Sequence, residues 1–225
     1  MKRKILFFSI LLTLLNTSVC FAIDWKTLHS RADTTDLAAA LRQAEQAPKS
    51  RDDLYILGLV YLRLYRPKDA EAVFDRLLSL APDMKEGLWG KAEVLRWYHR
   101  FSDAQGLLER LIRDQPDYYP PYVTLAYIRF LQYRFSEASQ LALNVVRLNK
   151  NEVDVSTYAR AHLIYAGAKG MIAHFGGPMS RLLNGFIVLP TLQEAQDMIP
   201  DSPEVLYALG CYYLLTPRGL GKMGK

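Results

Sequence analysis

Residues 54–82 contain two short stretches in which apolar residues recur at intervals of three and four positions. This spacing places the apolar side chains on one face of a helix and predicts helices over residues 52–65 and 67–80. Pro67 opens the second stretch, where its missing N–H group costs no helical hydrogen bond. Gly58 and Ala70 are small, so we expect the two helices to cross closely at these points. The defining positions are Leu54, Leu57, Gly58, Tyr61, Ala70, Phe74, Leu77 and Pro82.

The same frame returns twice, over residues 85–118 and 119–152. Its period of about 34 residues is that of a repeated helix–turn–helix unit. The matching positions are Leu88, Ala92, Leu95, Ala104, Leu108, Leu111 and Pro116 in the second unit, and Tyr122, Leu125, Ala126, Ala138, Ala142 and Val145 in the third. Lys91, Arg129 and Lys150 depart from the pattern. The recurrence predicts three full helix pairs over residues 51–152.

The turns inside the three units also match, as Arg66-Pro67-Lys68-Asp69, Arg100-Phe101-Ser102-Asp103 and Arg134-Phe135-Ser136-Glu137. We interpret these arginines as part of the turn rather than as a ligand site. Ser102 with Gln105 predicts a capping box at the start of the second helix of its unit.

Residues 23–50 are predicted to form an N-terminal capping segment. Leu37, Leu41 and Ala44 fall at helical spacing, Thr34 or Thr35 can act as N-cap, and Pro48 lies one full period before Pro82. This stretch therefore predicts the second helix of a degenerate first repeat, as the ends of a repeat array require.

The frame becomes irregular over residues 153–202. We expect a helix over residues 155–173, a break at residues 174–178, and an apolar stretch closed by Pro190. Thr191 with Glu194 predicts a capping box for a separate helix that ends before Pro200. This unit is longer than the period, and the surplus lies near residues 176–190. The run from Phe186 to Leu189 is interpreted as core filling.

Residues 203–225 predict an incomplete final repeat. Leu206, Leu209, Gly210 and Tyr213 restore the signature of a first helix over residues 203–215, and residues 218–225 do not continue it. One helix of a repeat cannot bury its own apolar face. Either the chain is a fragment, or another chain covers this helix, with self-association through it as one form of that alternative.

The signature residues above make residues 34–215 resemble the tetratricopeptide repeat family. The resemblance implies an all-α, right-handed solenoid of antiparallel helix pairs, irregular in its C-terminal third. It also implies a concave groove, lined by the first helix of each pair, that binds proteins or peptides. By position on those helices, the groove residues are Tyr55, Leu59, Leu62, Arg63, Trp89, Glu93, Arg96, Trp97, Val123, Tyr127, Phe130 and Leu131. Solvent-facing aromatic residues there are typical interface anchors. The alternative is that Trp97 and Phe130 pack between repeats.

Residues 153–225 also resemble the periplasmic tetratricopeptide repeat subunit of TRAP-type transport systems. The resemblance rests on the long helix, the glycine-containing break and the segment from Leu209 to Pro217. It implies an accessory subunit that assists a solute-binding protein.

Residues 1–22 predict a secretory signal peptide. Lys2, Arg3 and Lys4 precede an apolar stretch from Ile5 to Leu15, and cleavage is expected after Ala22. We therefore expect a periplasmic or secreted protein without a membrane span after signal removal. An uncleaved anchor and lipidation at Cys20 are the alternatives. Removal would leave Cys211 as the single cysteine, which fits a small buried apolar residue better than a nucleophile.

Composition and motifs exclude several classes of function. The net charge of +5 falls to +2 without residues 1–22, and the basic residues are scattered, which argues against nucleic-acid binding. The four histidines show no metal-binding spacing, and no phosphate-binding loop or nucleophile elbow is present. We expect a non-enzymatic protein without metal or cofactor.

Two functions remain. The first is a scaffold outside the cytoplasm that grips a protein or peptide in the concave groove. The second is an accessory subunit of a transport system that uses residues 176–190 to dock a partner or to shape a small-molecule cavity.

Overall fold

The computed structural model describes residues 24–32, 36–46 and 50–216, and the regular elements in them are all helical, which confirms the predicted fold class. The helices are α2 (Trp25–Ala32), α3 (Leu37–Gln46), α4 (Arg51–Arg63), α5 (Pro67–Leu80), α6 (Lys85–Trp97), α7 (Phe101–Asp114), α8 (Pro120–Leu131), α9 (Phe135–Val146), α10 (Val155–Phe175), α11 (Pro178–Met198) and α12 (Pro203–Leu215), with a 3₁₀ turn at Lys150–Glu152.

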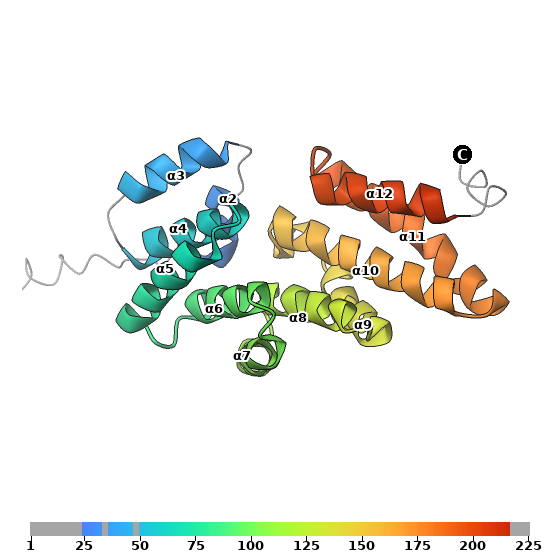
Figure 1. Cartoon of the computed structure of the whole chain (residues 1–225), viewed down its shortest axis with the longest axis horizontal. Helices are drawn as coiled ribbons and strands as arrows, with labels where there is room; N and C mark the ends of the chain where they lie inside the picture. The colour runs from blue at the N-terminus through green and yellow to red at the C-terminus, as the bar shows by residue number, and fades with distance from the viewer. Residues whose placement is uncertain (1–23, 33–35, 47–49, 217–225) are drawn as a thin grey trace, which may run out of the picture.

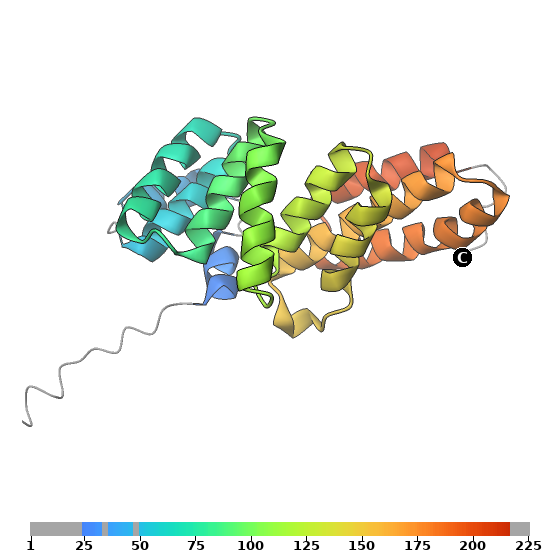
Figure 2. The ribbon, with the colours of Figure 1, turned by 90° about the horizontal axis from the view of Figure 1, so that it is seen from below.

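The helices form an elongated row of antiparallel pairs (Figures 1 and 2). Helix α4 packs on α5, α6 on α7, α8 on α9 and α10 on α11. The first helices of the pairs also contact one another along the row, from α4 to α6, α8, α10 and α12. Helices α2 and α7 lie on opposite sides of this row of first helices (Figure 1). The side that faces α2 is called the concave face below.

The turn between the two helices of a pair has the same backbone in all three full repeats. Tyr65, His99 and Tyr133 each take a left-handed conformation, with φ of 57°, 56° and 62°. The next N–H in each turn donates to the carbonyl five residues earlier, at 2.9 Å in every case. This arrangement satisfies a carbonyl at the end of the first helix and sets the direction of the second.

Each turn arginine pairs with the acidic residue three positions later. The distances from Nε to the carboxylate are 2.7 Å for Arg66, 2.8 Å for Arg100 and 2.6 Å for Arg134. The arginines therefore belong to the turns, as the recurrence predicts. The expected capping box of Ser102 and Gln105 is wrong, because α7 begins one residue before Ser102 and its cap position, Arg100, makes no side-chain cap bond.

The ring of Phe74 from α5 fixes the spacing between the first two repeats. A Cβ atom built on Gly58 of α4 would lie 2.5 Å from the ring, and one on Gly90 of α6 would lie 2.3 Å from it. Both glycines are therefore needed for the close approach of three helices, and Phe74 is fully buried between them. The prediction of a close crossing at Gly58 is confirmed.

The C-terminal third differs from the expectation at Pro190. A single helix, α11, runs from Pro178 to Met198 through this proline, although the sequence predicts a helix end there and a new start at Thr191. The Thr191 hydroxyl donates to the Ile187 carbonyl at 2.8 Å instead of capping a helix. Glu194 lies 3.0 Å from Nε2 of His162 on α10, so packing on α10 holds the helix across the proline.

The run from Phe186 to Leu189 only partly fills the core. Val188 is buried and packs with Leu192, Ala195 and residues of α12, whereas Phe186 is 55% exposed. The expected break after α10 is confirmed, because that helix ends at Phe175 and α11 starts at Pro178.

Some predictions fall outside the described residues: the signal peptide over residues 1–22 with Cys20, the caps at Thr34 or Thr35, Pro48, and the segment after residue 216. None of the helices in the described ranges combines the length and apolar character that crossing a membrane requires.

The different surroundings of Gly90 and Gly106 predict opposite effects of the same substitution to alanine. Gly90→Ala should lower the free energy of unfolding by about 1–3 kcal/mol, because the buried Phe74 ring has no room to move. Gly106 of α7 has no neighbouring atoms within 4 Å of a built Cβ, so Gly106→Ala should raise it by about 0.5–1 kcal/mol. Urea unfolding followed by circular dichroism measures both, and equal effects would contradict the role of Phe74.

Candidate partner-binding site

Helix α2 lies across the concave face and contacts several repeats at once. The Trp25 ring lies 5.4 Å from Tyr118, and the His29 ring lies 5.0 Å from Trp89. Trp25, Leu28, His29 and Ala32 are buried in these contacts. This short helix therefore fills the part of the concave face near the N-terminal ends of the first helices.

His29 connects α2 to α4 and to the start of α10. Its Nε2 lies 2.6 Å from the Tyr55 hydroxyl of α4, and its Nδ1 lies 3.3 Å from Oδ2 of Asp154, the N-cap of α10. Burial raises the pKa of Asp154, but His29 and the N–H of Thr157 outweigh it, so the net pKa is lowered. Burial raises the pKa of Tyr55 well above its usual value, which keeps the phenol neutral.

Four of the predicted groove residues are buried rather than exposed to solvent. Tyr55, Leu59, Trp89 and Glu93 are 0–4% exposed, although the sequence predicts solvent-facing anchors at these positions. His29 of α2 covers Tyr55 and Trp89, and Arg96, Thr124 and Arg160 surround Glu93, which the repeat frame alone does not reveal. Leu62 and Val123 are buried as well.

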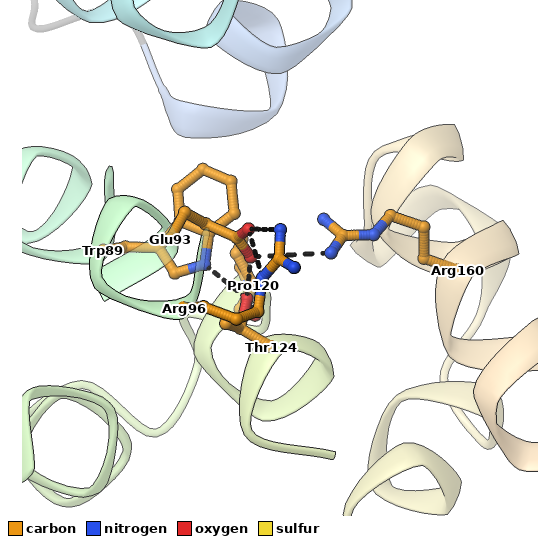
Figure 3. Close-up of polar contacts among 6 residues, drawn as sticks. All are labelled: Trp89, Glu93, Arg96, Pro120, Thr124 and Arg160. Atoms are coloured by element: carbon orange, nitrogen blue, oxygen red, sulfur yellow. Dashed lines mark hydrogen bonds and ion pairs between the residues drawn. The ribbon is translucent and has the colours of Figure 1, made fainter. Parts of the chain in front are cut away.

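The buried carboxylate of Glu93 on α6 joins α6 to α8 and α10 (Figure 3). Thr124 of α8 donates to Glu93 and receives a bond from Nε1 of Trp89 at 2.9 Å. Arg96 donates to the same carboxylate from Nε and Nη2, at 2.9 and 2.7 Å. Arg160 of α10 approaches the same carboxylate from the side opposite to α6, at 3.5 Å (Figure 3). Two guanidinium groups thus share one carboxylate.

The electrostatics of this cluster hold Glu93 ionised. Burial pushes its pKa upward, but Arg96, Arg160 and the Thr124 hydroxyl outweigh burial and lower the pKa from 4.5 to about 2. Arg96 and Arg160 carry two positive charges and Glu93 one negative charge, so the cluster has a net charge of +1. The Arg160 side chain, which is 36% exposed, brings this positive charge to the surface.

The half-buried predicted residues lie around this cluster. The Arg96 guanidinium stacks over the rings of Trp97 and Tyr127, at 5.3 Å from each centroid. Trp97 also packs edge-on against Tyr65, and Phe130 packs against Phe135. Trp97 and Phe130 therefore pack against neighbouring elements, as the alternative interpretation of these two residues predicts. The structure thus brings Trp97, Arg96 and Tyr127 together, with Arg63 and Phe130 also half-buried.

Sequence reasoning missed the residues that complete the site. Arg160 is 67 positions from Glu93 and lies outside the regular repeats, so no periodic signal connects the two. His29 and Trp25 lie before the first recognisable repeat. Asp154 was detectable, because it precedes a helical pattern as a good N-cap residue.

A polar hollow of about 510 Å³ lies away from this cluster, between α7, α8 and α9. Its central side chain, Arg129, is only 10% exposed and pairs with Glu109 and Glu137, at 3.0 and 3.4 Å. These pairs explain why an arginine fits where the repeat pattern wants an apolar residue. Within the described ranges, no group of three or more His, Cys, Asp or Glu side chains could hold a metal ion.

The lowered pKa of Glu93 predicts a pH-dependent stability. The unfolded chain takes up a proton near pH 4.5 and the folded chain only near pH 2, so this group stabilises the fold above that window and loses its effect as the pH falls through it. The loss should be on the order of 3 kcal/mol. Urea unfolding between pH 6 and pH 2 should therefore show a shallower decline for Glu93→Gln than for the wild type. The control Asp83→Asn changes an exposed carboxylate and should keep the wild-type slope. Identical slopes for both variants would refute this role of Glu93.

Comparison with solved structures supports the fold. A tetratricopeptide repeat protein from Parabacteroides merdae ATCC 43184 is 17% identical, with a TM-score of 0.63 over 83% of this chain and 70% of that chain. The structure "MamA RS-1 ArsTM double mutant" is 18% identical with a TM-score of 0.49, over 78% and 99% of the chains. "MamA MSR-1 C2" is 16% identical with a TM-score of 0.44, over 76% and 92%. The likeness to the MamA structures is too slight to carry an argument. Among curated proteins, none matches this chain.

The sequence of the first repeats also matches a family. Residues 61–127, from the end of α4 to the middle of α8, match the model described as "Tetratricopeptide repeat". This range contains the first two recurring turns, Phe74 and Glu93. Residues 61–127 are therefore similar to tetratricopeptide repeats, and the chain has the fold of a tetratricopeptide repeat protein.

Proposed function

We propose that this protein is a non-enzymatic scaffold outside the cytoplasm that binds a segment of a protein partner in the open half of its concave face. Tetratricopeptide repeat proteins generally act as protein-interaction scaffolds. The observation that carries the proposal is the cluster of Arg96, Trp97, Tyr127 and Arg160 around the buried Glu93. Arginine and aromatic side chains held in place are the residue types that dominate binding at protein interfaces.

The charge of this cluster favours a partner segment with a carboxylate. Arg96 is already bonded twice to Glu93 and stacked between two rings, so it is rigid and ready to accept a second anion without losing side-chain entropy. Arg160 makes a single long contact and has free donors on its exposed side. A partner carboxylate bound to the exposed side of Arg160 would balance the excess positive charge.

The location outside the cytoplasm rests on the pattern of residues 1–22. Western blotting of periplasmic and cytoplasmic fractions with a C-terminal tag would test it. An unprocessed chain found only in the cytoplasmic fraction would argue against the proposed location.

One observation favours the accessory-subunit alternative. Met179, Leu182, Leu183 and Phe186 of α11 are 52–67% exposed, on the helix that contains the surplus residues. Exposed apolar groups of this size are typical of contact surfaces. A transport subunit could dock there, as the resemblance to the TRAP-type subunit implies.

Paired variants separate the two proposals. Partners captured on the purified protein are identified by mass spectrometry, and each is then purified for measurement of its Kd. Trp97→Ala with Tyr127→Ala should weaken binding at least tenfold, because it removes the two rings that hold Arg96. Leu183→Glu with Phe186→Glu changes only exposed positions and should leave the Kd unchanged.

The reverse result would favour the accessory function. Equal binding by both double variants would contradict each proposal. Circular dichroism of the variants shows whether the helical fold is intact.

A further inference from the structure

Helix α2 occupies positions that the repeat frame assigns to the binding groove. Tyr55 and Trp89 stand at groove positions of the first two repeats, and both are at most 4% exposed because His29 of α2 lies against them. Trp25 extends the contact to Tyr118, with 5.4 Å between the ring centroids. The chain's own segment is therefore held as a partner peptide would be, as a short helix anchored in a groove by an aromatic ring.

Helix α2 depends on this contact for its helical form. It has eight residues, and an isolated helix of fewer than roughly 12 residues is marginal in water. One side of it, with Trp25, Leu28, His29 and Ala32, is buried against the repeats, whereas Ser30 and Arg31 on the other side are exposed. Because α4 packs on α5 and α6 on α7 without its help, α2 can leave the face while the row of helix pairs stays folded.

The polar contact between α2 and α10 leaves a buried carboxylate incompletely paired. Nδ1 of His29 lies 3.3 Å from Oδ2 of Asp154, whereas a charge-assisted N–H···O bond measures about 2.7–2.9 Å. This buried oxygen has no hydrogen-bond partner in the described part of the chain. The pKa of Asp154 is lowered, so the carboxylate is ionised at neutral pH. An ionised and buried oxygen in this state favours a cation that approaches more closely than the imidazole of His29 does.

We propose that α2 is a displaceable internal occupant of the concave face, and that a partner helix with an aromatic residue and a basic residue four positions later takes its place. The partner's ring would contact Tyr118 as Trp25 does, and its basic group would pair with Asp154. This inference goes beyond the proposed function, because it concerns the covered part of the concave face and not the cluster around Glu93.

The α2 sequence provides the probe. A fluorescein-labelled peptide of residues 24–32 is titrated with the full chain, and binding is followed by fluorescence anisotropy. The double variant Trp25→Ala, His29→Ala lacks the anchors of α2 and should bind the peptide at least tenfold more tightly than the wild type, whose own α2 competes at a high effective concentration. The matched control Ser30→Ala, Arg31→Ala changes exposed positions of the same helix and should bind as the wild type does.

Two further changes test how the peptide is held. In the double variant, Asp154→Asn removes the charge but keeps a side chain that caps α10, and it should weaken binding at least threefold. A peptide with Trp25→Ala should bind the double variant at least tenfold more weakly than the unmodified peptide does.

Hydrogen exchange of the wild type tests the displacement without any substitution. The amides of α2 should exchange at least tenfold faster than those of α8, because α2 opens locally while the row of repeats stays intact. Mass spectrometry of peptic fragments measures both rates in one sample.

The outcomes distinguish the possible occupants. Absence of binding to the double variant, equal Kd values for the double variant and the wild type, or equal exchange rates of α2 and α8 would overturn the proposal. A wild-type dimer in sedimentation that dissociates on the double substitution would overturn it in favour of exchange of α2 between two copies. The variants leave the cluster around Glu93 unchanged, so failure here does not affect the proposed function.

Discussion

The spacing of the first repeats depends on the packing of the Phe74 ring between Gly58 and Gly90. A ring fully buried between Gly58 and Gly90 lets α5 touch two successive first helices at once. Because each repeat contacts mainly its neighbours, this packing fixes the offset that the next repeat inherits. The later repeats use Leu108 and Ala142 at the matching position, and the repeating left-handed turn keeps the direction of each second helix constant.

The N-terminal helix α2 decides how much of the concave face is open. Its Trp25 and His29 occupy the space in front of α4 and α6, and Asp154 at the start of α10 closes it from the other side. A partner bound around Glu93, as proposed, would therefore contact only the part of this face that α2 leaves uncovered. The buried Glu93 holds the guanidinium groups of Arg96 and Arg160 on the two sides of its carboxylate.

Periodicity explains what the sequence could predict. The three helix pairs, the crossing at Gly58 and the role of the turn arginines follow from a short-range pattern that recurs once in every helix pair. The helix end predicted at Pro190 was wrong, because contacts between α11 and α10, such as Glu194 with His162, outweigh the local cost of a proline. The predicted exposure of the groove was also wrong. Tyr55 and Trp89 occupy groove positions in the frame, yet α2 covers them, and a contact between segments so far apart leaves no periodic trace.

The two ends of the row meet the same constraint in different ways. A repeat array needs its terminal apolar faces covered, since each helix pair relies on a neighbour for burial. At the N-terminal end, α3 packs on α4 and accepts the Tyr61 hydroxyl through Glu45. At the C-terminal end, α12 keeps the residues of α4 but leaves Leu206 and Tyr213 open to solvent. The same residue types are therefore buried in α4 and exposed in α12, because burial in a repeat array depends on the neighbouring helix and not on the side chains alone.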